Sequence, residues 1–111
     1  MGAIDLTQIG LSDEQRSRIQ SIRQEDKQAI AEVRNQLDAE TRQLRVLFEG
    51  SATDEQLRQQ HARVLAQRQQ LERMRFENFL RIRGVLTPEQ RSQLSLRWGR
   101  MRGQGRFFGR P

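Results

Sequence analysis

The side chains that could carry out acid–base or nucleophilic chemistry are few in this chain. His61 is its one histidine and there is no cysteine, so no nucleophile, base and orienting group can be assembled around that imidazole. Neighbouring carboxylates occur three times, at Asp13/Glu14, Glu25/Asp26 and Asp54/Glu55. Adjacent residues of a helix do not face each other, and acids in a first turn favour the helix dipole, so helix starts explain these pairs better than catalysis does. We therefore expect no enzyme and no catalytic residue.

A metal site is the next chemistry to consider, with His61 as the candidate ligand. A site built from nitrogen and oxygen needs three or four convergent ligands. No histidine or acid lies three or four residues from His61 along a helix. Ligands could approach it only from a facing helix, from Glu32, Asp38 or Glu40. We favour a structural or surface role for His61 and expect no bound metal. Gly103-Gln104-Gly105 follows no strand, so it is no dinucleotide fingerprint, and neither a nucleotide nor another cofactor is expected.

The end of the chain mixes guanidinium groups, aromatic rings and glycines. Residues 1–89 carry 14 basic and 14 acidic side chains, whereas residues 90–111 carry six arginines and no acid, which accounts for the net charge of +6. Arginine can contact phosphates and aromatic rings can stack on bases, so residues 97–111 taken alone look like an RNA-binding tail. They contain no repeated Arg-Gly-Gly unit, and we favour a disordered, solvated end over nucleic-acid binding.

Three capping boxes mark the elements that would position these groups. In each, a hydroxyl residue precedes a glutamine by three positions: Ser12/Gln15, Thr53/Gln56 and Thr87/Gln90. The hydroxyl can accept a hydrogen bond from the backbone N–H of the glutamine, whose side chain can accept one from the cap's own N–H. In the third box Pro88 holds the first helical position, where its missing N–H costs nothing. Each box predicts a helix start.

Apolar spacing predicts how far each helix extends. Residues 12–49 contain no Gly or Pro, repeat apolar side chains three and four apart, and end at Gly50. A second helix is predicted from about residue 54 to 85, and a third, shorter one from Pro88 to about Trp98. The predicted apolar stripes comprise Ile19, Ile22, Ile30, Val33, Leu37, Leu44, Leu47 and Phe48, then Leu57, His61, Val64/Leu65, Leu71, Met74, Phe79, Ile82 and Leu86, then Leu94, Trp98 and Met101.

These elements predict an all-α fold, because no strand-like alternation occurs. The linker of residues 50–52 is short, so the two long helices should fold back as an antiparallel hairpin followed by a short third helix. A helix of about 38 residues is about 57 Å long, more than the width of a compact domain of this size. We therefore expect an elongated molecule whose narrow apolar stripes are covered by pairing with a second copy, as a homodimer.

The phrases Leu11-Ser12-Asp13-Glu14-Gln15 and Leu86-Thr87-Pro88-Glu89-Gln90 lie near the two ends of this helical region. So placed, they resemble the LTxxQ motif of the Spy/CpxP family of bacterial periplasmic proteins, which also occurs once early and once late in the chain. The second copy matches the motif in full, and the first has Ser12 for threonine, which keeps the hydroxyl. The resemblance covers Leu11 to about Trp98.

The resemblance implies that the two motifs lie near each other, where the first and last helices meet. We regard their six defining residues as structural: Leu11, Ser12, Gln15, Leu86, Thr87 and Gln90. Leu11 and Leu86 would supply the apolar contact there. Chaperone-type members of the family usually have a proline-containing break in the first long segment, and this chain has none between Ser12 and Gly50. In that respect it is closer to the metal-resistance branch.

In function, the resemblance implies a periplasmic, ATP-independent chaperone of the envelope stress response that binds non-native proteins, suppresses their aggregation and works as an antiparallel homodimer. The alternative is a metal-responsive sensor or metal-resistance protein of the same fold. The second alternative, from the residues alone, is nucleic-acid binding through the arginine-rich tail.

Arginines among the apolar residues of the long helices could form the binding surface. Such arginines can simply lay their alkyl stems on the core, or they can form a shallow apolar and cationic surface that contacts many unfolded chains loosely. With the tail, which would act as a mobile basic and aromatic arm, they give the candidate client-binding residues Arg34, Arg45, Arg68, Arg75, Trp98, Met101, Phe107 and Phe108.

The domain organisation expected is a flexible extension over residues 1–10, a helical domain over 11–98 and a disordered tail over 99–111. The longest strictly apolar run is Val46-Leu47-Phe48, so we expect no transmembrane segment and no signal peptide in this sequence.

Overall fold

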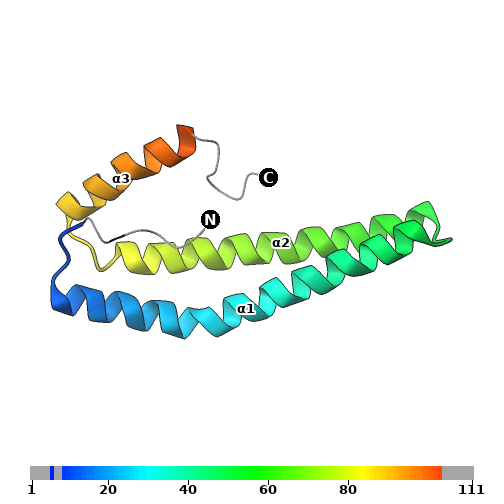
Figure 1. Ribbon diagram of the computed structural model, residues 1–111, viewed down its shortest axis with the longest axis horizontal. Helices are drawn as coiled ribbons and strands as arrows, with labels where there is room; N and C mark the ends of the chain where they lie inside the picture. The colour runs from blue at the N-terminus through cyan, green and yellow to red at the C-terminus, as the bar shows by residue number, and fades with distance from the viewer. Residues whose placement is uncertain (1–5, 7–8, 104–111) are drawn as a thin grey trace. The chain divides into compact units, whose positions relative to one another are not determined.

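The structure, a computed structural model, describes residue 6 and residues 9–103, with side chains described as far as residue 95. It contains three helices in the order α1 (Asp13–Glu49), α2 (Asp54–Arg83) and α3 (Pro88–Gly103) (Figure 1). No strand occurs among these residues, so the all-α prediction is confirmed. The chain divides into two units. One consists of the residues up to Asp26 and from Arg75 onward, and the other is Lys27–Met74.

Each helix begins at the capping box predicted for it. In every box the backbone N–H of the glutamine donates to the cap hydroxyl, and the backbone N–H of the cap donates to the glutamine Oε1. The first bond measures 3.1 Å in Ser12/Gln15, 3.1 Å in Thr53/Gln56 and 3.3 Å in Thr87/Gln90. The second measures 2.9, 2.9 and 2.8 Å in the same order. These reciprocal bonds satisfy backbone donors that a helix leaves free at its start. The sequence therefore located all three helix starts correctly.

The two long helices end at glycines. α1 ends before Gly50, as predicted, and the Gly50 N–H donates to the Val46 carbonyl at 3.2 Å. α2 ends two residues earlier than predicted, and the Gly84 N–H donates to the Leu80 carbonyl at 3.0 Å. Within each unit, α1 and α2 contribute segments that lie side by side and run in opposite directions (Figure 1). α1 has no break, in agreement with the absence of proline between Ser12 and Gly50.

α3 extends further than the sequence predicted. It passes Gly99 and ends at Gly103, so residues 99–103, assigned from the sequence to a disordered tail, are helical. A glycine inside a helix costs only about 1 kcal/mol relative to alanine, and the residues between the two glycines, Arg100, Met101 and Arg102, are strong helix formers. Residues 104–111 of the predicted tail lie outside the described residues.

The first unit contains a well-formed apolar core. Its buried members come from all three helices, from the segment before α1 and from the linker between α2 and α3: Leu6, Ile9, Ile19, Ile22, Phe79, Ile82, Leu86 and Leu94. Ile9 and Ile82 are the most completely enclosed, at 1% and 2% exposure. The expectation that residues 1–10 lie outside the helical domain is wrong for Leu6 and Ile9, because both are core residues. Their segment is too short to show a helical period, which is why the sequence did not predict their burial.

The second unit has a much thinner core. Its buried apolar residues are Val33, Val64 and Leu71. Gln60 is also buried there, and its Nε2 donates to the Glu40 backbone carbonyl at 2.8 Å, which satisfies a polar group that would otherwise be costly to enclose. So few buried apolar residues leave other apolar side chains of this unit in contact with water. None of the described helices has a stretch long and apolar enough to span a membrane.

Candidate functional site

The two LTxxQ-like phrases meet in the first unit through their glutamines. Gln15 Nε2 donates to Gln90 Oε1 at 2.8 Å, and Gln90 Nε2 donates to Gln15 Oε1 at 3.1 Å. Residues 75 positions apart in the chain are therefore joined by two reciprocal side-chain bonds. This contact places the start of α1 against the start of α3, which is the proximity that the resemblance implied.

Further hydrogen bonds occupy the remaining donors and acceptors of both side-chain carboxamides. Gln15 Nε2 also donates to the Val85 carbonyl at 3.0 Å, and Gln90 Nε2 donates to the Gly10 carbonyl at 2.9 Å. Each Oε1 accepts a second bond from its own capping residue, Ser12 or Thr87. Each carboxamide thus makes two donated and two accepted bonds, which is all that an amide side chain offers. We call this network the glutamine junction.

Apolar contacts surround the glutamine junction. Leu86 is 3% exposed and belongs to the core, and Leu11 packs against the same cluster while remaining half-buried. Gln90 itself is 9% exposed, so its four hydrogen bonds are made largely out of water. Polar groups enclosed in this way are expensive unless every one is satisfied, and here every one is. The motif residues therefore position three chain segments.

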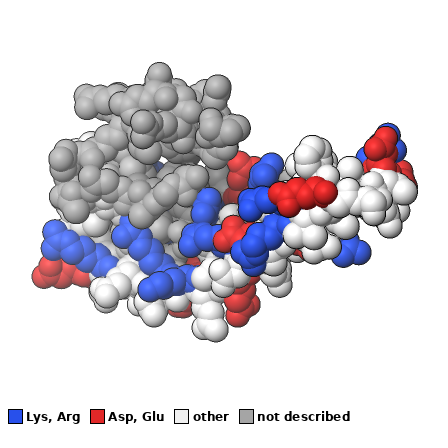
Figure 2. Space-filling model, turned by 45° about the vertical axis from the view of Figure 1, so that its right-hand side comes forward, with Lys and Arg blue, Asp and Glu red and all other residues white. Residues whose placement is uncertain are grey.

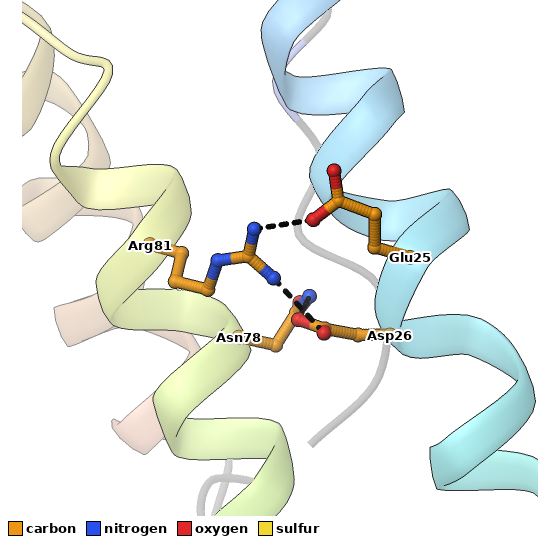
Figure 3. Close-up of polar contacts among 4 residues, drawn as sticks. All are labelled: Glu25, Asp26, Asn78 and Arg81. Atoms are coloured by element: carbon orange, nitrogen blue, oxygen red, sulfur yellow. Dashed lines mark hydrogen bonds and ion pairs between the residues drawn. The ribbon is translucent and has the colours of Figure 1, made fainter.

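A second polar cluster joins α1 and α2 within the first unit (Figure 3). Asp26, which interrupts the apolar stripe of α1, accepts hydrogen bonds from Asn78 Nδ2 at 2.9 Å and from Arg81 Nη1 at 3.0 Å. The other terminal nitrogen of Arg81 donates to Glu25. Hydrogen bonding to Glu25, aided by the charge of Asp26, raises the pKa of Arg81 above its ordinary value.

We call Glu25, Asp26, Asn78 and Arg81 the Arg81 cluster. It also shows what the neighbouring carboxylates of Glu25 and Asp26 bind. They were considered for acid–base chemistry, and in the structure both are bound by the same guanidinium. A guanidinium that bridges two acids across a helix pair fixes the facing positions of the helices. The cluster therefore has a structural role.

An apolar groove lies in the second unit, between the end of α1 and the start of α2. Its volume is about 510 Å³, and it is lined by Thr41, Leu44, Arg45, Phe48, Leu57, Arg58 and His61. Phe48 was predicted to belong to the apolar stripe, but its side chain is 76% exposed. The reason is local: near the turn, Leu57 is the apolar residue that α2 contributes to this surface, with Arg58 and His61 beside it. We call this surface the Phe48 groove.

Basic side chains surround the Phe48 groove. Arg45, Arg58 and His61 are part of its lining, and no acid is. Arg34 lies eleven residues before Arg45, about three turns, and Arg68 lies seven residues after His61, about two turns, so each continues the same side of its helix. Over the face of the molecule in Figure 2, Lys and Arg are interspersed with Asp and Glu and with uncharged surface.

The other predicted site residues fall in different places. Arg34, Arg45 and Arg68 are exposed, whereas Arg75 is half-buried and already has an interaction partner. Trp98 and Met101 belong to α3, but their side chains lie outside the described part, as do Phe107 and Phe108 altogether. His61 is exposed, and no group of three or more His, Cys, Asp or Glu residues that could hold a metal occurs among the described residues.

Sequence reasoning missed the exposure of Phe48 and the partners of Arg81. A signal for the first was available, because Phe48 is followed within two residues by the glycine that ends α1 and is preceded by Arg45 on the same side. A signal for the second was the interruption of the α1 stripe at Asp26, since an acid on an inward face needs a partner from the facing helix.

The glutamine junction joins the capping boxes that start α1 and α3, and the described residues form an all-helical structure in which the motif residues have an architectural role. Comparison with known families agrees with this structure. A family model described as "LTXXQ motif family protein" matches residues 6–97. The chain therefore belongs to the LTXXQ motif family, the family of Spy/CpxP-type periplasmic proteins. No curated protein and no solved structure matched the chain. The family match begins at Leu6, in keeping with the burial of that residue in the core.

Proposed function

We propose that this protein is an ATP-independent periplasmic chaperone that binds non-native proteins and suppresses their aggregation. Family membership supports this role, since the family is one of non-enzymatic chaperone and metal-resistance proteins. The observation that carries the proposal is the Phe48 groove, an apolar surface bordered by arginines on a chain of this family. Electrostatic attraction brings an unfolded chain to such a surface, and adaptable apolar contact then holds it without demanding one shape.

The exposure of apolar residues supports the same proposal. The large apolar side chains most open to water in the described part of the chain are Val46, Phe48, Leu65, Phe76 and Leu80. Three of them, Val46, Phe48 and Leu65, belong to the unit with the thinner core. Scattered exposed apolar residues are ordinary, but an aromatic ring that is 76% exposed beside an apolar groove is typical of a binding surface.

We also propose that the working form is a homodimer, because a second copy would cover part of the apolar surface that a single chain leaves open. The metal-responsive alternative gains no support from the described residues, where no set of three His or acidic side chains converges. We therefore advance the chaperone function alone.

The deciding experiment measures light scattering by a reduced or heat-treated model protein in the presence of the purified chain and in the absence of nucleotide. Suppression at substoichiometric to equimolar ratios is the expected result. Calorimetric titration with zinc, nickel and cobalt provides the counterpart. Saturable tight metal binding without suppression of aggregation would replace the chaperone proposal with the metal-responsive one.

A further inference from the structure

The Phe48 groove contains an aromatic ring that the described residues leave largely uncovered. Phe48 is the most exposed of the large apolar residues in the described part of the chain, and it lies beside Leu44 and Leu57 in the groove lining. Its volume of about 510 Å³ lies within the range of small-ligand and side-chain pockets, and it is open enough to receive side chains of an extended or helical segment. The groove therefore offers room and apolar contact for one or two large side chains.

The charged side chains in the groove lining are Arg45 and Arg58, and no acid belongs to this lining. The side chain of Arg45 makes no hydrogen bond or ion pair with another described residue. Arg58 contacts Glu55 at 3.5 Å, but both side chains are more than 60% exposed, so water weakens this pair. A ligand that brings carboxylates to this rim would find cations that are free to bind it.

We propose that the Phe48 groove selects acidic apolar segments, in which a large apolar side chain is flanked by aspartate or glutamate. This inference rests on the proposed chaperone function and names the class of client segment. The apolar side chain packs against Phe48, Leu44 and Leu57, while the flanking carboxylates pair with Arg45 and its basic neighbours. An acid-flanked segment is thereby preferred over one flanked by lysine or arginine.

The C-terminal segment of a second copy of this chain fits the groove less well than an acidic segment does. Its aromatic residues Trp98, Phe107 and Phe108 lie within residues 97–111, which carry five arginines and no acid. Such a segment would bring like charge to a basic rim, and like charges in contact are unfavourable. Charge complementarity therefore favours a foreign acidic segment over the tail of another copy.

The test uses fluorescein-labelled synthetic peptides and the full chain, followed by fluorescence anisotropy. One peptide alternates glutamate with phenylalanine and leucine, and its partner has lysine in place of every glutamate. We expect the acidic peptide to bind about tenfold or more tightly than the basic one at low salt, with the difference shrinking as salt rises. Phe48→Ala should weaken binding of the acidic peptide about fivefold, as the loss of an aromatic anchor does.

Charge reversal at Arg45 tests whether the arginines that line the groove recognise the peptide. Arg45→Glu should weaken binding of the acidic peptide and strengthen binding of the lysine peptide. A general loss of structure would not produce these opposite changes. Two matched controls should leave both affinities unchanged: Arg63→Glu, which makes the same charge change outside the groove lining, and Val46→Ala, which alters an apolar side chain that is 61% exposed and also outside the lining. Circular dichroism of each variant verifies that the helices are intact.

Several results would overturn the inference. Equal binding of the two peptides would do so, and so would equal loss in Arg45→Glu and Arg63→Glu. A change in sedimentation mass with Phe48→Ala, without a change in peptide binding, would assign the groove to self-association. Because the aggregation assay is run on the same variants, the two proposals can fail separately. If aggregation is suppressed but the two peptides bind equally, only the proposed selectivity of the groove is refuted. If the peptides bind selectively but aggregation is not suppressed, only the proposed chaperone function is refuted.

Discussion

A capping box accepts either glutamate or glutamine at its last position, because only a side-chain oxygen is needed to accept the cap's N–H. The box at Thr53/Gln56 uses no more than that, since no second bond to the Gln56 carboxamide occurs among the described residues. At Gln15 and Gln90 the nitrogen is needed as well. Each Nε2 donates to a backbone carbonyl and to the other glutamine. The glutamine junction thus gives a physical reason for glutamine, and not glutamate, in both motif copies.

This role predicts that Gln90→Glu destabilises the fold. A carboxylate at this position keeps the cap bond but loses both donors, and it brings negative charge toward the Gly10 carbonyl and Gln15 Oε1. We expect the free energy of unfolding to fall by about 1–3 kcal/mol, the cost of leaving enclosed polar groups unsatisfied. Urea denaturation followed by circular dichroism at neutral pH measures it.

Gln56→Glu is the matched control, and it should change the free energy of unfolding by less than about 0.5 kcal/mol. The pH dependence gives a further check. Acceptors around the new carboxyl at position 90 raise its pKa in the folded state, so stability is lost as pH rises through that pKa and recovers as pH falls. A Gln90→Glu variant as stable as Gln56→Glu at neutral pH would contradict the proposed role of the nitrogen.

At the scale of helices, the Arg81 cluster explains how α1 tolerates an acid on its inward face. The side chain of Asp26 is 28% exposed, so most of it is removed from water, and Asn78 and Arg81 from α2 bind its two oxygens. An apolar residue at this position would extend the stripe but would give no polar contact between the helices. The cluster therefore favours one alignment of α1 with α2 in the first unit.

Removing the guanidinium tests this alignment. In Arg81→Met the two carboxylates lose their shared cation while the alkyl volume is kept. We expect faster amide hydrogen exchange in α1 around Glu25 and in α2 around Asn78, because local opening becomes easier. Arg58→Met is the control: it removes an ion pair within α2, between residues three apart, and should leave exchange at the cluster unchanged. Equal protection in both variants would mean that the cluster does not hold the helices.

The features of this fold that depend on neighbouring residues could be predicted from the sequence. Those that depend on contacts between distant segments could not. The helix starts were predictable because a capping box lies within four residues. The proximity of the two motifs came from family resemblance, but the reciprocal bonding of Gln15 and Gln90 could not be predicted, since it depends on how segments 75 positions apart meet. The partner of Arg81 was missed for the same reason. Periodicity identified the inward face of α1, yet it could not tell that Phe48 would find too few partners across the turn.

At the scale of the whole molecule, both units leave large apolar side chains exposed. In the first unit, Phe76 and Leu80 are 38% and 39% exposed and lie four residues apart, on one side of α2. Phe76 stacks on the buried Phe79 with ring centroids 6.2 Å apart, so the exposed ring is held in place by the core. A fixed apolar pair of this kind suits self-association, whereas the Phe48 groove with its basic rim suits a ligand of opposite charge.

This division predicts which side chains would hold the proposed homodimer together. Sedimentation equilibrium at micromolar concentration should give twice the chain mass of 13.1 kDa for the unmodified protein. The double variant Phe76→Asp/Leu80→Asp should sediment as a single chain, because two carboxylates cannot be enclosed without partners. Phe48→Asp introduces a single carboxylate in the groove and should keep the dimer mass. A single-chain mass for the unmodified protein at every concentration would refute the dimer, and dissociation by Phe48→Asp alone would move the interface to the groove.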